Sequence, residues 1–198
     1  MQLVLASSSP YRRDLLSRLG VFFHTDPPDV DEAALPNEDP EDLVARLAQS
    51  KARAVGQRHP DALIIGSDQV AVFGSTVLTK PHTTERAIEQ LSQMRGTTVN
   101  FLTGVCLLNT RTQRCQVAVE RCAVTFRSLS DAAIAAYVAR ERPLDCAGSF
   151  KSEGLGIVLF ERIVANDPTT LVGLPLIRLV TMLTTEGVDL LTPRPAAH

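Results

Sequence analysis

The 198-residue sequence lacks the features that mark several large protein classes. Its net charge of −2 at pH 7 provides no general attraction to nucleic acids or to anionic membranes. No apolar run approaches the roughly 18 residues that a membrane-spanning helix needs. The N-terminus enters a strand pattern directly, without the basic segment and cleavage site of a signal peptide. We therefore expect a cytoplasmic protein that binds neither nucleic acid nor membrane.

Cysteine and histidine are few and widely spaced. The four cysteines, Cys106, Cys115, Cys122 and Cys146, contain no Cys-x-x-Cys pair, so reduced thiols are favoured over a disulfide framework. The four histidines have no spacing typical of a zinc site. No nucleophile elbow supports a Ser-His-Asp hydrolase. The sequence therefore points away from Cys/His metal sites and from serine hydrolase chemistry.

What the sequence does contain is an alternation of strand and helix patterns that is typical of an α/β protein. We expect a mixed, twisted sheet flanked by helices, with two lobes around a central cleft, in a single domain of residues 1–191. Residues 192–198 have nothing to bury and are expected to form a disordered tail. Strands are predicted at 2–6, 21–23, 63–65, 70–73, 77–78, 97–109, 116–126 and 157–160. Helices are predicted after residue 9, from 40 to 56, after residue 83, after residue 130, and from 171 to 183.

The stretch from Leu63 to Gln69 is the most unusual part of the chain. Its first three residues are aliphatic and predict a buried strand that ends at Gly66. A hydroxyl, a carboxylate and an amide follow, on Ser67, Asp68 and Gln69. Ligands of open α/β sheets bind beyond the carboxyl ends of strands, and an unpaired buried charge is costly. Asp68 is therefore predicted to lie in a functional site.

A second candidate site follows the first strand, where Ser7, Ser8 and Ser9 precede a proline. A serine followed by proline is typical of a helix start, and the free N–H groups of such a start attract anions. Arg12 and Arg13 in the first turn oppose the helix dipole. A bound phosphate would explain these two arginines, whereas a solvated basic turn is the alternative.

Two lysines and an acidic loop complete the candidate residues. Lys51 falls on the apolar face of the predicted helix 40–56, where it either snorkels to the edge of the core or points at an anion. Lys80 follows a predicted hairpin. Asp31 and Glu32 are either solvated or help to hold a divalent cation. Cations beside carboxylates are typical of a polyphosphate site with Mg²⁺, and hydrolysis of a phosphoanhydride by activated water fits such a site.

The stretch 146–156 contains three glycines, which allow the backbone to approach a ligand closely. Its spacing matches neither a P-loop nor a dinucleotide-binding motif. Taken together with other segments, however, it resembles the Maf family of nucleotide pyrophosphatases. The motifs that carry this resemblance occur in family order: Leu5–Arg13, Val30–Glu32, Lys51-Ala52, Gly66–Val70, Lys80-Pro81 and Cys146–Gly154.

The resemblance implies an inosine-triphosphatase-like fold, a homodimer, and a nucleoside triphosphate pyrophosphatase that uses a divalent cation, Mg²⁺ or Mn²⁺. Such an enzyme releases pyrophosphate and removes non-standard nucleotides from the pool. Asp68 matches the residue that accepts the proton of water and is expected, with Glu32, to hold the metal. Lys51 and Lys80 are expected to neutralise the developing charge. The serine-rich turn and the two arginines that follow it are expected to bind the substrate.

Within the family, the chain resembles the 7-methyl-GTP branch, since it has Gln69 and the run Phe150-Lys151-Ser152-Glu153 where the thymidine and uridine triphosphate branch has other residues. Tyr11, Gln69 and Glu153 match positions associated with base choice, and Lys151 is included among the substrate-binding residues. Tyr11 can stack on a flat cationic base, and Glu153 can accept hydrogen bonds from guanine.

Three alternatives remain open: a dTTP/UTP-type pyrophosphatase of the same family, a non-catalytic nucleotide-binding regulator of septum formation, and a structural domain with scattered charges. One residue departs from the family pattern. The family has glycine before the Lys-Pro pair, and this chain has Thr79. A β-branched residue disfavours positive φ, so either the turn before Lys80 differs here or the glycine is not essential.

Overall fold

The computed structural model describes residues 1–192, so the predicted tail 192–198 lies outside the described residues apart from Thr192. Within this range the strands are β1 (Gln2–Ala6), β2 (His24–Thr25), β3 (Ala62–Phe73), β4 (Thr76–Leu78), β5 (Thr98–Asn109), β6 (Arg114–Phe126) and β7 (Phe160–Ala165). The α-helices are α1 (Pro10–Ser17), α2 (Pro40–Gly56), α3 (Thr84–Met94), α4 (Asp131–Glu141) and α5 (Leu176–Thr185). Each helix in this part of the chain is too short or too polar to span a bilayer.

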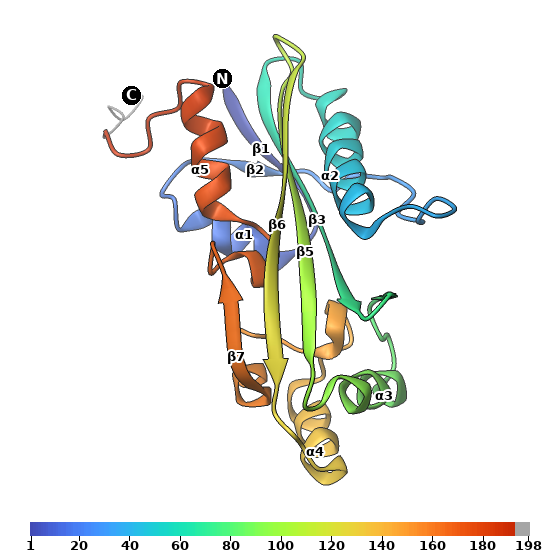
Figure 1. The fold of residues 1–198 in the computed structure, drawn as a ribbon. Coiled ribbons are helices and arrows are strands. Elements are labelled where there is room, and N and C mark those ends of the chain that lie inside the picture. Colours follow the sequence, from blue (N-terminus) through green and yellow to red (C-terminus); the bar gives the residue numbers. More distant parts are fainter. Residues whose placement is uncertain (193–198) are drawn as a thin grey trace.

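The strands form one mixed sheet in the order β2-β1-β3-β5-β6-β7, with β4 paired to β3. β1 is parallel to both β2 and β3, whereas the β3–β5, β5–β6 and β6–β7 pairs are antiparallel. Three long strands, β3, β5 and β6, run the length of the molecule (Figure 1). This arrangement confirms the predicted α/β class with a mixed sheet.

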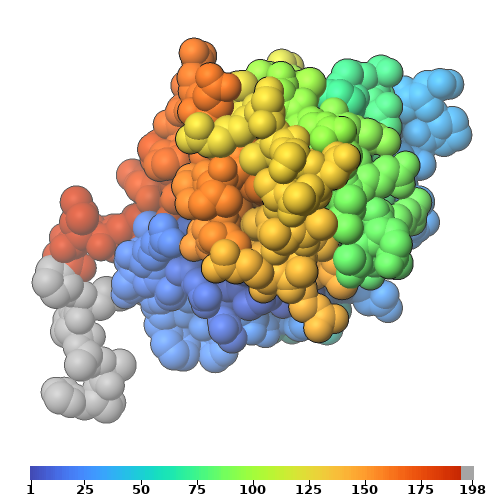
Figure 2. Space-filling model, turned by 90° about the horizontal axis from the view of Figure 1, so that it is seen from below, coloured from blue at the N-terminus to red at the C-terminus, as the bar shows by residue number. Residues whose placement is uncertain are grey.

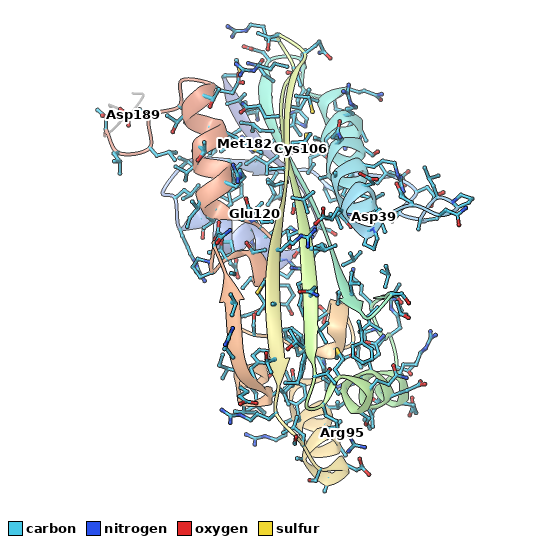
Figure 3. The ribbon with its side chains drawn as sticks, viewed as in Figure 1. Asp39, Arg95, Cys106, Glu120, Met182 and Asp189 are labelled. Atoms are coloured by element: carbon cyan, nitrogen blue, oxygen red, sulfur yellow. The ribbon has the colours of Figure 1, made fainter. Side chains whose placement is uncertain are left out.

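The first lobe comprises β1, β2, α1, α2, α5 and the adjoining ends of the long strands. Because successive side chains of a strand point to opposite faces, two layers of core form on this part of the sheet. Leu5 and Ile65 pack with α1 and α5 on one face, whereas Ala6 and Ile64 pack with α2 on the other. In Figure 3, Glu120 of β6 lies toward α5.

The second lobe comprises β4, β7, α3, α4 and the opposite ends of the long strands. Its core contains four phenylalanine rings in edge-to-face contacts, with centroid separations from 4.7 to 5.8 Å. Figure 2 views the molecule from this end, with α3 in green and α4 in yellow-gold at the near surface. The rings belong to Phe101, Phe126, Phe150 and Phe160.

One edge of β3 is interrupted, and this interruption separates the lobes. β1 pairs with β3 as far as Gly66, and β4 pairs with it from Ala71 onward. Within the described residues, the intervening stretch 67–70 is paired with β5 on its other edge only. The predicted end of the strand at Gly66 is therefore wrong: the strand continues to Phe73 because its antiparallel pairing with β5 continues. What ends at Gly66 is the pairing with β1.

Most other predicted elements are present, and two strands were wrongly placed. Residues 21–23 form no strand, and β2 lies instead at His24–Thr25, leaving Phe22 exposed. The predicted strand 157–160 is a 3-10 helix, Leu155–Leu159, and β7 begins at Phe160. Both strand errors concern short apolar runs, for which periodicity does not separate strand from other structure. The predicted helix 171–183 also begins too early: α5 begins at Leu176, after Gly173 and Pro175 interrupt the apolar run.

Candidate active site

A cleft of about 850 Å³ lies between the two lobes, at the interrupted edge of β3. It brings together segments that are far apart in the sequence: the serine-rich turn, the acidic loop, α2, the middle of β3, the turn after β4 and the glycine-rich loop. Eleven of the predicted site residues line it: Ser7, Ser8, Ser9, Tyr11, Arg12, Glu32, Lys51, Asp68, Gln69, Lys80 and Glu153. Motifs that are widely spaced along the chain thus form one concave surface.

Helix α2 places Lys51 at the base of the cleft. Asp39 caps this helix by accepting from the N–H of Glu41 and lies at its N-terminal end (Figure 3). The helix approaches the sheet closely, because a side chain at Gly66 would overlap the carbonyl oxygen of Ala48. A second such contact is made by Gly104, the β5 residue paired with Asp68. The glycines are therefore needed for close packing of α2 on the sheet.

Lys51 joins two carboxylates. Its Nζ lies 2.6 Å from Asp68 Oδ1 and 2.7 Å from Glu32 Oε1. Lys51 is 5% exposed and Asp68 is 7% exposed, so this ion pair is largely removed from water. Burial of two charges is tolerated when they are paired and hydrogen-bonded. The alternative that Lys51 merely snorkels to solvent is therefore wrong: its ammonium points at two acids in the cleft.

Two further cations act on the same acids. Burial raises the pKa of Glu32, but the hydrogen bond and charge of Lys51, together with the charges of Lys80 and Arg12, outweigh it and hold this pKa below its ordinary value. Burial lowers the pKa of the Arg12 guanidinium, while the charges of Asp68 and Glu32 raise it. The cluster thus combines two carboxylates with three cations, which is suited to a polyphosphate chain.

Beside Lys51, the cleft offers two carboxylates to a divalent cation. Within residues 1–192 no group of three His, Cys, Asp or Glu side chains could hold a metal ion. Glu32 and Asp68 nevertheless present hard carboxylate oxygens on either side of the Lys51 ammonium. Mg²⁺ is commonly bound by one or two carboxylates, with substrate phosphates and water as its other ligands. The pair therefore fits a cation that arrives with a phosphate ligand.

The serine-rich turn is ordered by its own hydroxyls. Ser7 Oγ accepts from the N–H of Ser9 at 3.1 Å, and Ser9 Oγ caps α1 by accepting from the N–H of Arg12 at 3.4 Å. The N-terminus of α1 thus faces the cleft with the partial positive charge of its dipole. Arg12 itself is held from the other side, because its Nε donates to the carbonyl of Gly173 at 2.8 Å.

Gln69 is fixed by backbone carbonyls. Its Nε2 donates to the carbonyl of Thr170 at 2.9 Å and lies 3.2 Å from that of Leu171. The same nitrogen lies 2.9 Å from the Thr103 hydroxyl. These contacts use the donor end of the amide, so the amide oxygen is the end that remains for a ligand.

The glycine-rich loop is anchored by Phe150, which is buried in the aromatic core of the second lobe. Three residues later Glu153 reaches the cleft, where it lines the same surface as Tyr11. Burial raises the pKa of Tyr11, and the nearby Cys146, Asp145 and Glu153 raise it further. Tyr11 therefore offers a neutral aromatic ring beside a carboxylate.

Two predicted substrate-binding residues do not line the cleft. Arg13 is exposed and lies 3.5 Å from Asp14. Lys151 lies 3.9 Å from Asp145, and its backbone N–H donates to the Tyr137 hydroxyl. Both belong to matching motifs, but neither is among the residues that line the cleft, although Asp145, the partner of Lys151, does line it.

Threonine at position 79, where the family has glycine, is compatible with the observed turn. Thr79 does not adopt a positive φ, and the positive φ in this turn occurs at His82 instead. Threonine therefore fits the turn without strain, and Lys80 reaches the cleft as predicted.

Sequence reasoning missed the acceptors that hold Gln69 and Arg12. They are backbone carbonyls of Thr170, Leu171 and Gly173, and Ser67 Oγ also lies 2.9 Å from the Gly173 oxygen. A backbone carbonyl carries no side-chain signature. The one available signal was the glycine and proline that interrupt the apolar run after Leu171.

Comparison with known proteins gives concordant matches. A family model described as Maf-like protein matches residues 2–186 of the chain. A relative from Nitrosococcus oceani named 7-methyl-GTP pyrophosphatase is 55% identical over 189 residues, which is 96% of this chain and 95% of the relative. Relatives of the same name from Pseudomonas aeruginosa and Pseudomonas putida are 56% and 57% identical, each covering 95% of this chain and 98% of the relative.

Among solved structures, the chain is similar to the Ham1 protein of Staphylococcus aureus. The TM-score is 0.52 at 13% sequence identity, and the match covers 95% of this chain and 100% of that chain. At this identity the likeness concerns the fold alone, and it confirms the predicted fold class.

Proposed function

The chain belongs to the Maf-like protein family, and from this membership and the geometry of the cleft we propose that it is a nucleoside triphosphate pyrophosphatase acting on 7-methyl-GTP. The reaction is hydrolysis of the α-β phosphoanhydride to the nucleoside monophosphate and pyrophosphate. The observation that carries the proposal is the buried Lys51 in contact with both Asp68 and Glu32, in a cleft that Arg12 and Lys80 also line.

Each charged residue has a role in this reaction. Asp68 accepts the proton of the water that attacks the α-phosphorus, as a carboxylate at the cleft surface can. Lys51, Lys80 and Arg12 neutralise the charge that develops on the phosphate oxygens. The N-terminus of α1, with its serine-rich turn, receives phosphate oxygens through backbone N–H groups.

Glu32 and Asp68 would hold a divalent cation, Mg²⁺ or Mn²⁺. When bound, such a cation supplies positive charge to the phosphate oxygens of the substrate. The two carboxylates both contact Lys51, whose charge limits their mutual repulsion.

The base of 7-methyl-GTP carries a positive charge. The part of the cleft lined by Tyr11, Gln69 and Glu153 suits such a base. The neutral ring of Tyr11 offers a π-face for a cationic base. Glu153 supplies a carboxylate that attracts the charge and accepts from guanine N–H groups. Gln69 adds an acceptor whose orientation is set by the carbonyls of Thr170 and Leu171.

The substrate assignment is tested by pyrophosphate release from 7-methyl-GTP, GTP, UTP and dTTP, each with Mg²⁺ or Mn²⁺. The expected result is the highest kcat/KM for 7-methyl-GTP. A preference for UTP or dTTP would overturn the base assignment. Saturable nucleotide binding without pyrophosphate would instead support the non-catalytic regulator.

The assignment of the general base is tested by Asp68→Asn. This change removes the proton acceptor and is expected to lower kcat by about 10²–10⁴-fold. Asp189→Asn is the matched control, because Asp189 lies in the chain after α5, away from the cleft (Figure 3). Near-normal turnover by Asp68→Asn would remove Asp68 from the mechanism.

A further inference from the structure

The segment 167–177, between β7 and the first turn of α5, holds both a phosphate-facing and a base-facing side chain. The carbonyls of Thr170 and Leu171 accept from Gln69 Nε2 at 2.9 and 3.2 Å. The carbonyl of Gly173 accepts from Arg12 Nε at 2.8 Å. A displacement of this one segment would therefore move two cleft residues that come from different elements.

The segment is closed on itself by a buried carboxylate. Asp167 is 3% exposed, and its Oδ1 accepts from the backbone N–H of Thr169 at 2.8 Å and from the Thr169 hydroxyl at 2.6 Å. Its Oδ2 accepts from the backbone N–H of Ile177 at 2.6 Å. Pro175, which precedes α5, has no side chain that can cap the helix, so Asp167 takes that role.

The Thr169 hydroxyl completes the closure. Its Oγ1 accepts from the backbone N–H of Leu176 at 2.9 Å and lies 2.9 Å from the carbonyl oxygen of Leu174. It therefore links the start of the segment to its end. The carbonyls that hold Gln69 and Arg12 lie between these two ends, where the chain forms a 3-10 turn, Thr170–Val172.

We propose that Asp167 and Thr169 are positioning residues for substrate recognition: by closing the segment 167–177, they set the orientation of Gln69 and Arg12 in the cleft. The amide of Gln69 could otherwise turn about its last bond and exchange its donor and acceptor ends. Arg12, with Nε bound, keeps its two terminal nitrogens for a phosphate. The role in recognition rests on the proposed pyrophosphatase function.

Asp68 is held in a different way. Its carboxylate pairs with Lys51 on α2, and this contact does not pass through the segment. Loosening the segment is therefore expected to change base selectivity and KM more than kcat. A small displacement of the binding groups reduces selectivity, because these groups set the geometry of the bound substrate.

The experiment compares Thr169→Val, which removes the hydroxyl at nearly constant volume, with Thr169→Ser, which keeps it. Thr181→Val is the matched control, because the Thr181 hydroxyl is exposed and bonds to the Ile177 carbonyl within α5. The readout is the ratio of kcat/KM for 7-methyl-GTP to that for GTP, measured on one preparation. This ratio does not depend on the fraction of protein that is folded.

For Thr169→Val we expect the selectivity ratio to fall about tenfold and KM to rise, with a smaller change in kcat. Thr169→Ser and Thr181→Val are expected to retain the wild-type ratio. If Thr169→Val loses thermal stability but keeps the wild-type ratio and KM, the role is structural and the proposal is overturned.

A second measurement separates this inference from the proposed function. If the wild-type protein hydrolyses no nucleoside triphosphate, the proposed function fails, and a crystal structure of Thr169→Val still tests the geometry. We expect the Gln69 amide and the Arg12 guanidinium to lose their bonds to the segment. Retention of the bonds to Thr170, Leu171 and Gly173 in that variant would overturn the positioning role.

Discussion

The two faces of β3 differ sharply at consecutive residues. Asp68 points toward α2 and pairs with Lys51, so this face carries ionised groups in contact with each other. Gln69 points to the opposite face and bonds to neutral carbonyls of Thr170 and Leu171. Because a strand alternates its side chains between faces, adjacent residues can serve different purposes without sharing partners. The structure thus directs Asp68, the proposed proton acceptor, and Gln69, the proposed base contact, to opposite faces of one strand.

The difference extends to what covers each face. On the charged face, α2 approaches closely over Gly66 and Gly104, which brings the Lys51 ammonium to the acids. On the neutral face, an irregular segment closed by Asp167 supplies carbonyl acceptors. A helix therefore positions the charges on one face, whereas a segment with its own internal hydrogen bonds supplies the carbonyl acceptors on the other.

Among variants that test the difference between the two faces, Lys51→Met is expected to have the largest effect, which is on stability. Loss of the ammonium leaves Asp68 and Glu32 without their shared partner, and breaking a buried pair in this way costs about 3 kcal/mol of unfolding free energy. Urea unfolding measures the loss. The control is Lys80→Met, an exposed lysine, for which a change within about 0.5 kcal/mol is expected. Equal stability of the two variants would mean that the charged face is not held together by Lys51.

Gln69→Met tests the neutral face and is expected to have a smaller effect, which is on substrate selectivity. The change removes an amide whose nitrogen donates to Thr170 and Leu171 and whose oxygen is proposed to accept from the base, while it keeps a side chain of similar length. Kinetic comparison of 7-methyl-GTP with GTP should show about a tenfold loss of selectivity. A variant that retained full selectivity would assign base choice to Tyr11 and Glu153 alone.

The smallest effect is expected from Glu32→Gln and depends on pH. Burial raises the pKa of Glu32, but Lys51, Lys80 and Arg12 hold it below the ordinary value of 4.5. A lowered pKa in the folded state stabilises the protein above that ordinary value, and this contribution is lost as the pH falls through the folded-state pKa. Unfolding measured across acidic pH should therefore show wild type and variant converging below pH 4.5. A constant difference at all pH values would contradict the Lys51–Glu32 contact.

Local patterns predicted the charged face well. Asp39-Pro40 and the apolar stripe of α2 predicted both the helix and the inward position of Lys51, because capping and periodicity are local properties. The family inferred from the motifs is confirmed by the match over residues 2–186. The predicted pyrophosphatase function agrees with the names of the relatives.

Long-range packing could not be predicted in the same way. The continuation of β3 past Gly66 depends on its pairing with β5, and the role of Gly104 depends on the path of α2. The acceptors of Gln69 are backbone atoms about a hundred residues away in the chain. Arg13 and Lys151 belong to recognisable motifs, but whether their side chains line the cleft depends on how α1 and the glycine-rich loop pack, which the motifs do not encode.

The measurement that tests the separation of the two faces most directly is kcat/KM for 7-methyl-GTP and GTP, determined for Asp68→Asn and Gln69→Met beside the wild type. The account predicts that Asp68→Asn lowers both values by the same factor and leaves their ratio unchanged. It predicts that Gln69→Met changes the ratio and largely retains kcat for 7-methyl-GTP. If Asp68→Asn altered the ratio as much as Gln69→Met does, or if both variants lost turnover equally, the division between the faces would be contradicted.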